Sequence, residues 1–210
     1  MIIAVDGPAA SGKGTLARRL AAHFGLAYLD TGLLYRATAW KALLAGDPAD
    51  PAVSVAAARA IATSDLADPR LRSEEVGEAA SVVAAIPAVR AALLDFQRDF
   101  ARRPPGAVLD GRDIGTVVCP EADAKLFLTA TLAARAERRF KELQAGESGA
   151  IYERVLQDMK TRDARDSGRV IAPLTRAAEV LELDTTALDA DAAFAKAVDF
   201  IATRLAGRTH

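Results

Sequence analysis

The feature that most constrains this chain is a glycine-rich loop near its N-terminus, Gly-Pro-Ala-Ala-Ser-Gly-Lys-Gly-Thr over residues 7–15. A short apolar run at 2–5 precedes the loop, and Leu16, Leu20 and Phe24 follow it at helical spacing. A buried strand that leads through such a loop into a helix is the context of a phosphate-binding loop, or P-loop. The pattern predicts an α/β protein with a parallel sheet.

The residues of this loop predict how it would hold a triphosphate. Gly7 and Gly12 allow the backbone to curl so that its N–H groups point at phosphate oxygens. Lys13 is expected to neutralise the β- and γ-phosphates, and the Thr15 hydroxyl to bind Mg²⁺ directly or through water. A chance glycine-rich turn is disfavoured by the flanking strand and helix. The residues expected to contact the triphosphate are Gly7, Pro8, Ala9, Ala10, Ser11, Gly12, Lys13, Gly14 and Thr15.

Two details narrow the class of P-loop protein. Most P-loops place Ser or Thr directly after the lysine, whereas Gly14 separates Lys13 from Thr15 here. This Lys-Gly-Thr form favours a small-molecule kinase. A GTPase would need an Asn-Lys-x-Asp element to read guanine, and the sequence contains no asparagine. A GTPase is therefore excluded.

The remaining periodic segments predict five parallel strands joined by right-handed crossovers. Strands are expected at 2–5, 27–29, 107–109, 124–128 and 180–183. Helices are expected at 16–24, from an N-cap at Thr31 to Gly46, from Pro87 to Arg103, at 131–143, at 151–164 after a break at 146–149, and around Phe194, Val198 and Ile201.

A single domain is expected, with two regions added to its core. The predicted core comprises residues 1–46, 104–145 and 170–210. An insert at 47–103 begins with an Ala-rich stretch, 47–72, that has weak periodicity and no convincing hairpin signal. A lid is predicted at 146–169.

Composition excludes several classes of protein. The net charge of −1 disfavours a nucleic-acid partner, which calls for a basic excess. The only cysteine, Cys119, excludes an internal disulfide, and its apolar neighbours favour a buried structural thiol. Two histidines are too few for a histidine-rich metal centre. No apolar run reaches membrane-spanning length and no signal-peptide pattern opens the chain, so we expect a cytoplasmic protein without a membrane partner.

Phosphoryl transfer needs cations from outside the P-loop, and one group of arginines lies in the second half of the chain. Arg162, Arg165 and Arg169 are spaced by three and four residues, with Asp166 among them. They share one helical face if the helix extends that far. An ordinary solvated face is an equal alternative for these residues. The same alternative applies to Arg135, Arg138 and Arg139.

A second group lies where a core strand ends. Arg112 and Asp113 follow the strand at 107–109, at the carboxyl edge where open α/β sheets bind ligands. Asp113 could instead cap a turn or hold magnesium-bound water, and Asp110 could orient such water or serve only the turn. Arg36 carries little weight in isolation.

Five segments, taken in order, resemble bacterial cytidylate kinases. The first is the P-loop with the Asp-Gly that opens it, and the others span nearly the whole chain. A P-loop alone is generic, but five ordered motifs are specific. The later segments are Leu-Asp-Thr-Gly-Leu-Leu-Tyr-Arg at 29–36, Ala-Ala-Ser-Val-Val-Ala-Ala-Ile-Pro-Ala-Val-Arg at 79–90, Asp-Gly-Arg-Asp-Ile-Gly-Thr-Val-Val at 110–118, and Arg-Asp-Ala-Arg-Asp-Ser-Gly-Arg at 162–169 with Ala-Pro-Leu at 172–174.

The resemblance implies a monomeric kinase that uses ATP and Mg²⁺ to phosphorylate CMP and dCMP. It implies that Ser81, Arg90 and Asp113 read the cytosine edge. Arg36, Arg112 and Arg169 would hold the monophosphate, and Arg162 and Asp166 would contact the sugar, while Arg165 is assigned either to this set or to the lid. The implied catalytic residues are Lys13, Arg112, Arg162 and Arg169. The implied CMP-binding residues are Thr31, Arg36, Ser81, Arg90, Arg112, Asp113, Arg162, Asp166 and Arg169.

Other interpretations of these residues remain open at this stage. Arg90 alone would be taken for a surface arginine, Ser81 for a cap or exposed hydroxyl, and Tyr35 for a core aromatic. The stretch at 47–72 is shorter than in many cytidylate kinases, which leaves discrimination among CMP, dCMP and UMP open. The alternative functions are a kinase of another nucleoside monophosphate or small metabolite, and a nucleotide-sensing or RNA-binding P-loop protein without turnover.

Overall fold

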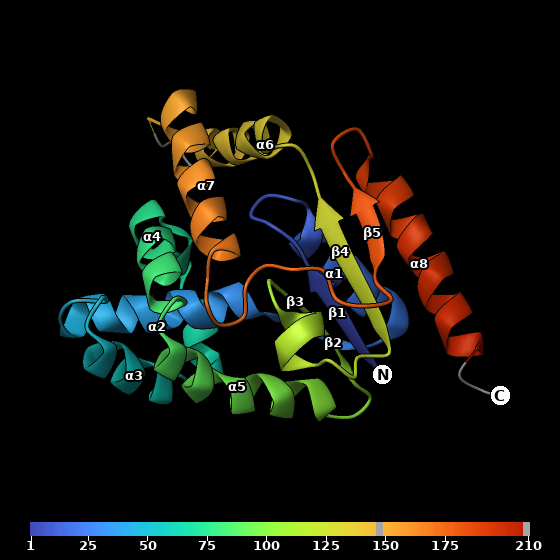
Figure 1. The fold of residues 1–210 in the computed structure, drawn as a ribbon, viewed down its shortest axis with the longest axis horizontal. Coiled ribbons are helices and arrows are strands. Elements are labelled where there is room, and N and C mark those ends of the chain that lie inside the picture. The colour runs from blue at the N-terminus through green and yellow to red at the C-terminus, as the bar shows by residue number, and fades with distance from the viewer. Residues whose placement is uncertain (146–148, 208–210) are drawn as a thin grey trace.

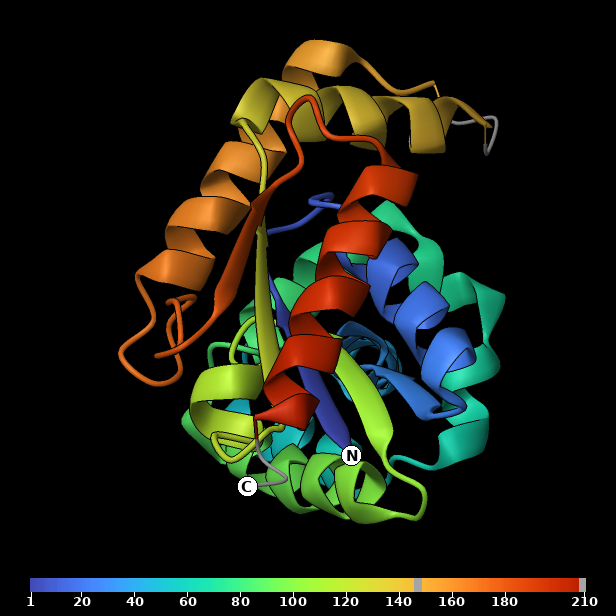
Figure 2. The same ribbon diagram turned by 90° about the vertical axis from the view of Figure 1, so that its right-hand side faces the viewer.

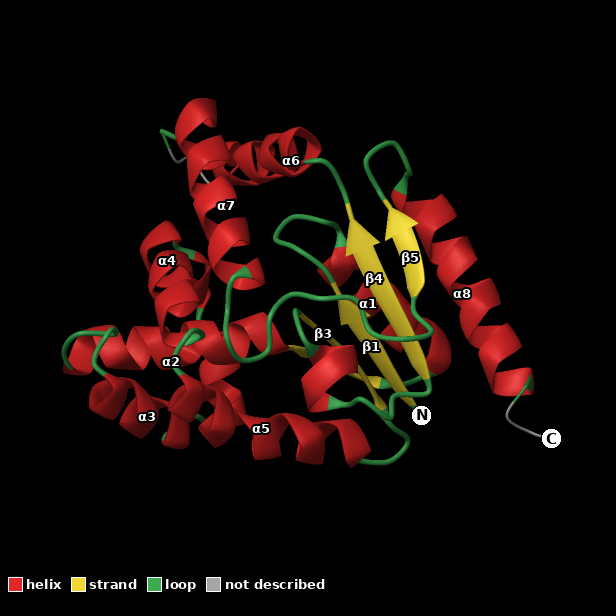
Figure 3. Cartoon of the chain, viewed as in Figure 1, coloured by secondary structure: helices red, strands yellow, loops and turns green. Residues whose placement is uncertain are grey.

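The computed structural model describes residues 1–145 and 149–207. Within them, one parallel sheet of five strands runs in the order β2-β3-β1-β4-β5 (strands labelled in Figure 1, yellow in Figure 3). The α/β fold and all five predicted strands are confirmed, with boundaries within two residues of those expected. The strands are β1 (Ile2–Asp6), β2 (Ala27–Asp30), β3 (Ala107–Gly111), β4 (Ala124–Thr129) and β5 (Leu181–Asp184).

Helices cover both faces of this sheet (Figures 1 and 2). One face is covered where Leu16 and Leu20 of α1 and Ile201 of α8 pack on Val108 and Leu126. The opposite face carries α2 and α5, and α4 packs against α2. Two further helices, α6 and α7, lie beyond the carboxyl ends of the strands (Figure 1). The bounds are α1 (Lys13–Phe24), α2 (Thr31–Ala45), α4 (Glu74–Val83), α5 (Pro87–Arg102), α6 (Leu132–Ala145), α7 (Tyr152–Ser167) and α8 (Ala190–Ala206).

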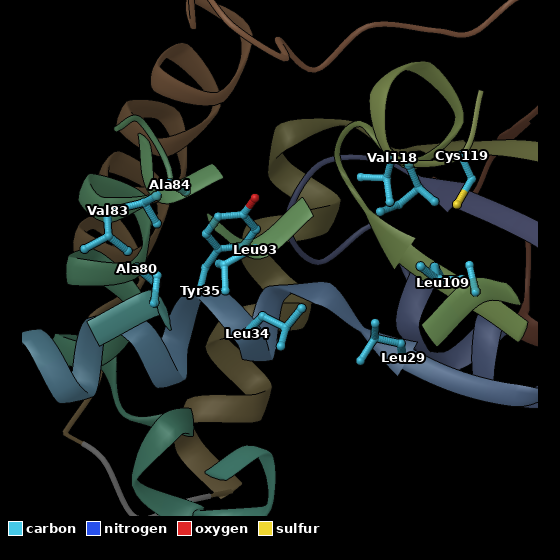
Figure 4. Packing of buried hydrophobic residues seen from close by; sticks show 14 of the residues in the cluster. Leu29, Leu34, Tyr35, Ala80, Val83, Ala84, Leu93, Leu109, Val118 and Cys119 are labelled. Atoms are coloured by element: carbon cyan, nitrogen blue, oxygen red, sulfur yellow. The ribbon is translucent and has the colours of Figure 1, made fainter. Parts of the chain in front are cut away.

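The apolar core under α2, α4 and α5 explains two residues that the sequence left open. Figure 4 shows Tyr35 of α2 packed near Leu93 of α5 and the buried residues of α4. Tyr35 is 9% exposed, which confirms it as a core aromatic. Cys119 lies over Leu109 in the same cluster, and burial raises the pKa of its thiol to about 11. A protonated, buried thiol is structural, as predicted.

The regular elements of the region at 47–103 are all helical, in line with the lack of a hairpin signal at 47–72. Helix α3 (Pro51–Arg59) begins where the Asp50 carboxylate accepts from the Ala52 N–H, and α4 begins where the Ser73 hydroxyl accepts from the Val76 N–H. Two short 3₁₀ turns, Thr63–Ala67 and Pro69–Arg72, join them. The alanine side chains of this region give little hydrophobic contrast between the two faces of a helix, so sequence periodicity missed α3 and α4. The division into core, insert and lid stays a prediction.

Two helix ends differ from those expected. The N-cap of α2 is Asp30, so the prediction of Thr31 as the cap is wrong; Thr31 is the first helical residue and its hydroxyl donates to the Asp110 carbonyl at 2.8 Å. Helix α7 ends at Ser167, so Arg169 lies beyond it and the predicted common face does not extend to this residue. The expected break at 146–149 falls largely outside the described residues.

Among the described residues, no single helix is long and apolar enough to cross a membrane. Helices α4 and α5 pass that length and composition test only as a pair, and the pair is bent by 100°.

Candidate active site

The P-loop joins β1, the central strand, to α1 at the carboxyl edge of the sheet. Gly7 has a φ of 153°, and a Cβ there would lie 2.3 Å from the Leu128 carbonyl oxygen of the neighbouring strand. No residue with a side chain fits at this distance. Gly12 (φ 85°) and Ala10 (φ 57°) are both in the left-handed region, and they turn the chain into α1. The local shape therefore depends on the glycines that the motif supplies.

Every carbonyl oxygen from residue 8 to residue 12 accepts a hydrogen bond. A loop that turns its N–H groups inward turns its carbonyls outward, where each needs a donor. Two donors come from the loop and its helix, and three come from side chains on other elements. The donors are Lys13 Nζ to Pro8 (3.3 Å), Arg135 to Ala9 (3.3 Å), Arg138 to Ala10 (3.4 Å), the Thr185 hydroxyl to Ser11 (3.0 Å) and the Leu16 N–H to Gly12 (3.1 Å).

The arginines of α6 are thus not an ordinary solvated face. Arg135 is buried and also binds Asp163 of α7, with 2.6 Å between Nη2 and Oδ2. Arg138 donates to the hydroxyl of Thr185 at 3.0 Å and to its carbonyl. Only Arg139 shows the expected surface pattern, with a 3.3 Å ion pair to Glu142. Helix α6 therefore braces the P-loop from outside.

Two carboxylates and Lys13 meet at the ends of β2 and β3. Burial, and then the charge of Arg112, lower the pKa of Lys13 to about 8. Burial, and then the nearby Asp30, raise the pKa of Asp110 to about 6. The Tyr28 hydroxyl donates to Asp110 at 2.8 Å. The Asp110 carboxylate thus joins β3 to Tyr28 of β2 and also lies beside Lys13.

This edge is compatible with Mg²⁺. Thr15 is exposed at the start of α1, and the like charges of Asp30 and Asp110 would be relieved by a cation. The described residues hold no cluster of three His, Cys, Asp or Glu that would bind a metal alone. Mg²⁺ does not need one, because it keeps several waters and takes further ligands from phosphates.

Asp166 brings several arginines together. It is 1% exposed and accepts from Arg112 Nε at 2.8 Å and from Arg169. Although burial favours its neutral form, the pKa of Asp166 is lowered by Arg112, Arg169 and Arg162. Burial, and then the charge of Arg112, lower the pKa of Arg162 to about 9. More positive than negative charge is collected here, which suits an anion with several oxygens.

Arg36 reaches this cluster from α2. Its guanidinium donates to the carbonyls of Leu71 (2.6 Å) and Ser73 (3.2 Å). Burial, and then the charge of Arg139, lower its pKa, and Arg112 acts in the same direction. Arg165 lies on the last turn of α7, next to Asp166 in sequence.

A second buried ion pair joins Arg90 of α5 to Asp113, which follows β3. Arg90 lies over the Tyr35 ring, 5.3 Å from its centre, so it is not a surface residue. Asp113 stands at the N-cap position of the turn that follows, but its side chain makes no capping hydrogen bond there and pairs with Arg90 instead. Ser81 of α4 is 3% exposed, and its hydroxyl has no hydrogen-bond partner among the described residues. A buried hydroxyl of this kind is suited to a ligand.

Sequence reasoning missed several residues that shape the site. It assigned no role to the three side chains that donate to the P-loop carbonyls, Arg135, Arg138 and Thr185. It also assigned none to the carboxylates of Asp6 and Asp163. The three-residue spacing of Arg135 and Arg138 was visible, but it did not show what they touch. The usable signal for Asp6 was an acidic residue at the end of an otherwise apolar strand.

Two cavities of similar size lie at opposite ends of the sheet. One of about 530 Å³ adjoins the P-loop and is lined by Pro8, Thr129, Arg135 and Leu174, among others, which is ample for part of a nucleotide. The other, of about 540 Å³, lies near the start of β4, where Glu179 and Arg204 pair with each other. Only the first is next to the phosphate loop.

The sheet order, the P-loop and the arginine cluster define a P-loop protein of the α/β class. The cytidylate kinase family model matches residues 3–203. A cytidylate kinase of Paramagnetospirillum magneticum is 61% identical over 97% of this chain and 98% of its own length. A cytidylate kinase of Xanthobacter autotrophicus is 58% identical over 99% of this chain and 100% of its own length. The chain therefore belongs to the cytidylate kinase family, which confirms the predicted resemblance.

Likeness to solved structures is more distant and concerns the fold alone. An uncharacterized protein from Eubacterium ventriosum superposes with a TM-score of 0.56 at 16% identity, covering 97% of this chain and 98% of its own.

The hydrogen bond from Thr185 to the P-loop leads to a first prediction. Thr185→Val keeps the shape of the side chain but leaves the Ser11 carbonyl without its donor. The loss of a buried hydrogen bond costs about 1–3 kcal/mol, so we expect ATP affinity to fall about tenfold in titration calorimetry. Thr203→Val, which removes an exposed hydroxyl bond to the Asp199 carbonyl on α8, is the matched control. Equal ATP affinity in all three proteins would contradict this role.

Proposed function

We propose that this protein transfers the γ-phosphoryl group of ATP in line to the phosphate of CMP and dCMP. The observation that carries the proposal is the order of three groups along one edge of the sheet. The P-loop follows β1, Arg112 follows β3 and is joined to Arg169 through Asp166, and the Arg90–Asp113 pair adjoins them. Donor phosphates, acceptor phosphate and acceptor base thus each have a chemically suitable partner.

On the donor side, the backbone of Gly7–Thr15 would bind the β- and γ-phosphates, with Lys13 as the cation at the point of transfer. The chain offers the Thr15 hydroxyl to Mg²⁺, directly or through water, with Asp110 close by. Bound with ATP, Mg²⁺ would supply positive charge to the β- and γ-phosphate oxygens. Lys13 would serve the same transition state from the protein side.

On the acceptor side, Arg36, Arg112 and Arg169 would hold the monophosphate, and Arg162 would contact the sugar close to it. Asp166 supports this assignment because it holds Arg112 and Arg169 before any substrate binds. Preformed donors need no reorganisation when charge develops at the transferring group. We therefore assign catalytic roles to Lys13, Arg112, Arg162 and Arg169. Arg165 and the predicted lid at 146–169 would cover the site.

The base would be recognised by Ser81, Arg90 and Asp113, with Thr31 nearby at the start of α2. Cytosine presents a carbonyl and a ring nitrogen as acceptors and an exocyclic amine as donor. An arginine and a carboxylate side by side match that edge, because one donates and the other accepts. Uracil reverses the pattern at two positions and would leave buried groups unpaired.

The transfer would need no covalent intermediate and no general base. The acceptor phosphate is already anionic near neutral pH, so alignment and charge neutralisation are what the protein must supply. Closure of the predicted insert and lid would exclude water and limit ATP hydrolysis. We further propose that the enzyme acts as a cytoplasmic monomer.

A panel of nucleoside monophosphates tests the proposal directly. In a coupled assay of ADP release we expect CMP and dCMP to accelerate ATP consumption far more than AMP, GMP or UMP, and Lys13→Ala to abolish turnover. Equal rates with AMP or UMP would show that the base assignment is wrong. The absence of turnover with every monophosphate would instead indicate a nucleotide-sensing protein.

The base-reading pair leads to a second test of the acceptor. Asp113→Asn replaces a carboxylate acceptor with an amide and removes the partner of a buried arginine. Because the lost charge-assisted bond is worth roughly 2–3 kcal/mol, we expect kcat/KM for CMP to fall about a hundredfold and the preference for CMP over UMP to narrow. Glu121→Gln, at an exposed ion pair with Arg102, is the control. An unchanged CMP to UMP ratio in Asp113→Asn would remove Asp113 from base recognition.

The lowered pKa of Lys13 leads to a prediction for pH. Only the charged amine attracts phosphate, so ATP affinity should be full below pH 8 and fall as pH rises through about 8. Bound phosphates favour the charged amine, so ATP binding near pH 8.5 should take up protons. Calorimetry in two buffers of different ionisation enthalpy measures this uptake, which Lys13→Arg should abolish. Identical binding enthalpies in the two buffers for the unmodified protein would contradict the assignment.

A further inference from the structure

Asp6 is a buried carboxylate for which the mechanism above has no use. It is the last residue of β1 and directly precedes the P-loop, and it is 5% exposed. Its Oδ1 accepts from the Ile114 N–H and its Oδ2 from the Gly115 N–H, both at 2.8 Å. These N–H groups open the short π-helical turn η3 (Ile114–Val118), where helical backbone leaves them without an internal partner. One side chain thus satisfies two orphan donors.

The two hydrogen bonds accepted by Asp6 hold a turn that only two residues separate from the sheet. In the parallel β1–β3 ladder, Asp6 is the register partner of Gly111. Arg112 and Asp113 are the only two residues between Gly111 and the turn whose N–H groups Asp6 accepts. Backbone pairing at Asp6 therefore fixes one end of this two-residue segment, and the Asp6 side chain fixes the other.

Burial of a carboxylate carries a cost in desolvation, which indicates that Asp6 does more than fill space in the core. Burial, with the charge of Asp113 acting in the same direction, raises the pKa of Asp6 to about 7, and Arg112 opposes that rise. Space around it is also restricted, since a Cβ on Gly115 would lie 3.4 Å from Asp6 Oδ2 and 3.3 Å from Lys125 Cδ. A neutral residue at this position would avoid the desolvation but could not accept from both N–H groups.

We propose that Asp6 is a positioning residue for phosphoryl transfer, which holds Arg112 and Asp113 at a fixed place relative to the P-loop. Asp6 itself touches neither substrate. The backbone of Asp6 leads into the donor loop, and its side chain holds the turn beyond the acceptor residues. The inference rests on the proposed function, because it gives Arg112 the acceptor phosphate and Asp113 the acceptor base.

Asp6→Asn tests this role with almost no change in shape. Its amide group can accept from only one of the two N–H groups and opposes a donor to the other. We expect KM for CMP to rise about tenfold and kcat to fall about tenfold, because a small displacement of reacting groups is expensive. KM for ATP should change less than twofold, and the CMP to UMP ratio of kcat/KM should fall.

Asp123→Asn is the matched control. Asp123 caps the opposite end of the same strand, where its Oδ2 accepts from the Ile2 N–H at 2.7 Å. Its replacement should lower the unfolding temperature and leave both KM values and the base preference unchanged. Kinetics are measured well below the unfolding transition of each protein. If Asp6→Asn also lowers only the unfolding temperature, or weakens ATP and CMP equally, the positioning role is overturned.

A second variant keeps the proposal testable if Asp6→Asn does not fold. Gly115→Ala retains the carboxylate and both N–H groups but crowds Oδ2 through its new Cβ. We expect a smaller rise of KM for CMP, about threefold, with KM for ATP unchanged; an unaltered KM for CMP would count against the proposal. The acceptor specificity of the unmodified protein tests the proposed function separately from these variants. If the unmodified protein uses another monophosphate, the effect of each variant on KM for that acceptor is compared with its effect on KM for ATP.

Discussion

A backbone loop that offers its N–H groups to a phosphate must turn its carbonyls the other way, and the rest of this structure depends on that constraint. The carbonyls from Pro8 to Gly12 each accept a hydrogen bond. The three side-chain donors from outside the loop are Arg135, Arg138 and Thr185, contributed by α6 and the end of β5. Elements that follow the loop by more than a hundred residues are therefore needed to finish it. Without them, one buried and two part-buried carbonyls would lack donors.

The proposed acceptor side differs from the P-loop, because its arginines are already held together in the free protein. One carboxylate, Asp166, binds Arg112 and Arg169, while Arg162 lies close by with a lowered pKa. Mutual repulsion among these cations is a cost of folding that a bound phosphate would remove. The site is in this sense prepared for its ligand, and part of the stability of the free protein is given up for it.

The sequence sufficed for the fold and the P-loop because both depend on local patterns. Apolar runs of strand length and the spacing of Leu16 and Leu20 identify elements without knowledge of their neighbours. The helices at 51–59 and 74–83 were missed because alanine shows little contrast between faces. Arg135 and Asp6 each lie more than a hundred residues away, along the sequence, from the P-loop carbonyl and the turn that they respectively bind. No pattern within one segment reports such a contact, and the roles of the site residues therefore remain proposals.

Helix α7 connects the two halves of the site through residues three positions apart. Asp163 binds Arg135, which contacts the P-loop, and Asp166 binds Arg112, which follows β3. Residues at this spacing are neighbours on a helix, so a rotation of α7 would move both ion pairs together. An anion that drew Arg112 toward itself would pull on Asp166 and, through α7, on the arginine that braces the donor loop. The proposed donor and acceptor sites are thus linked through α7, in addition to the sheet from which both arise.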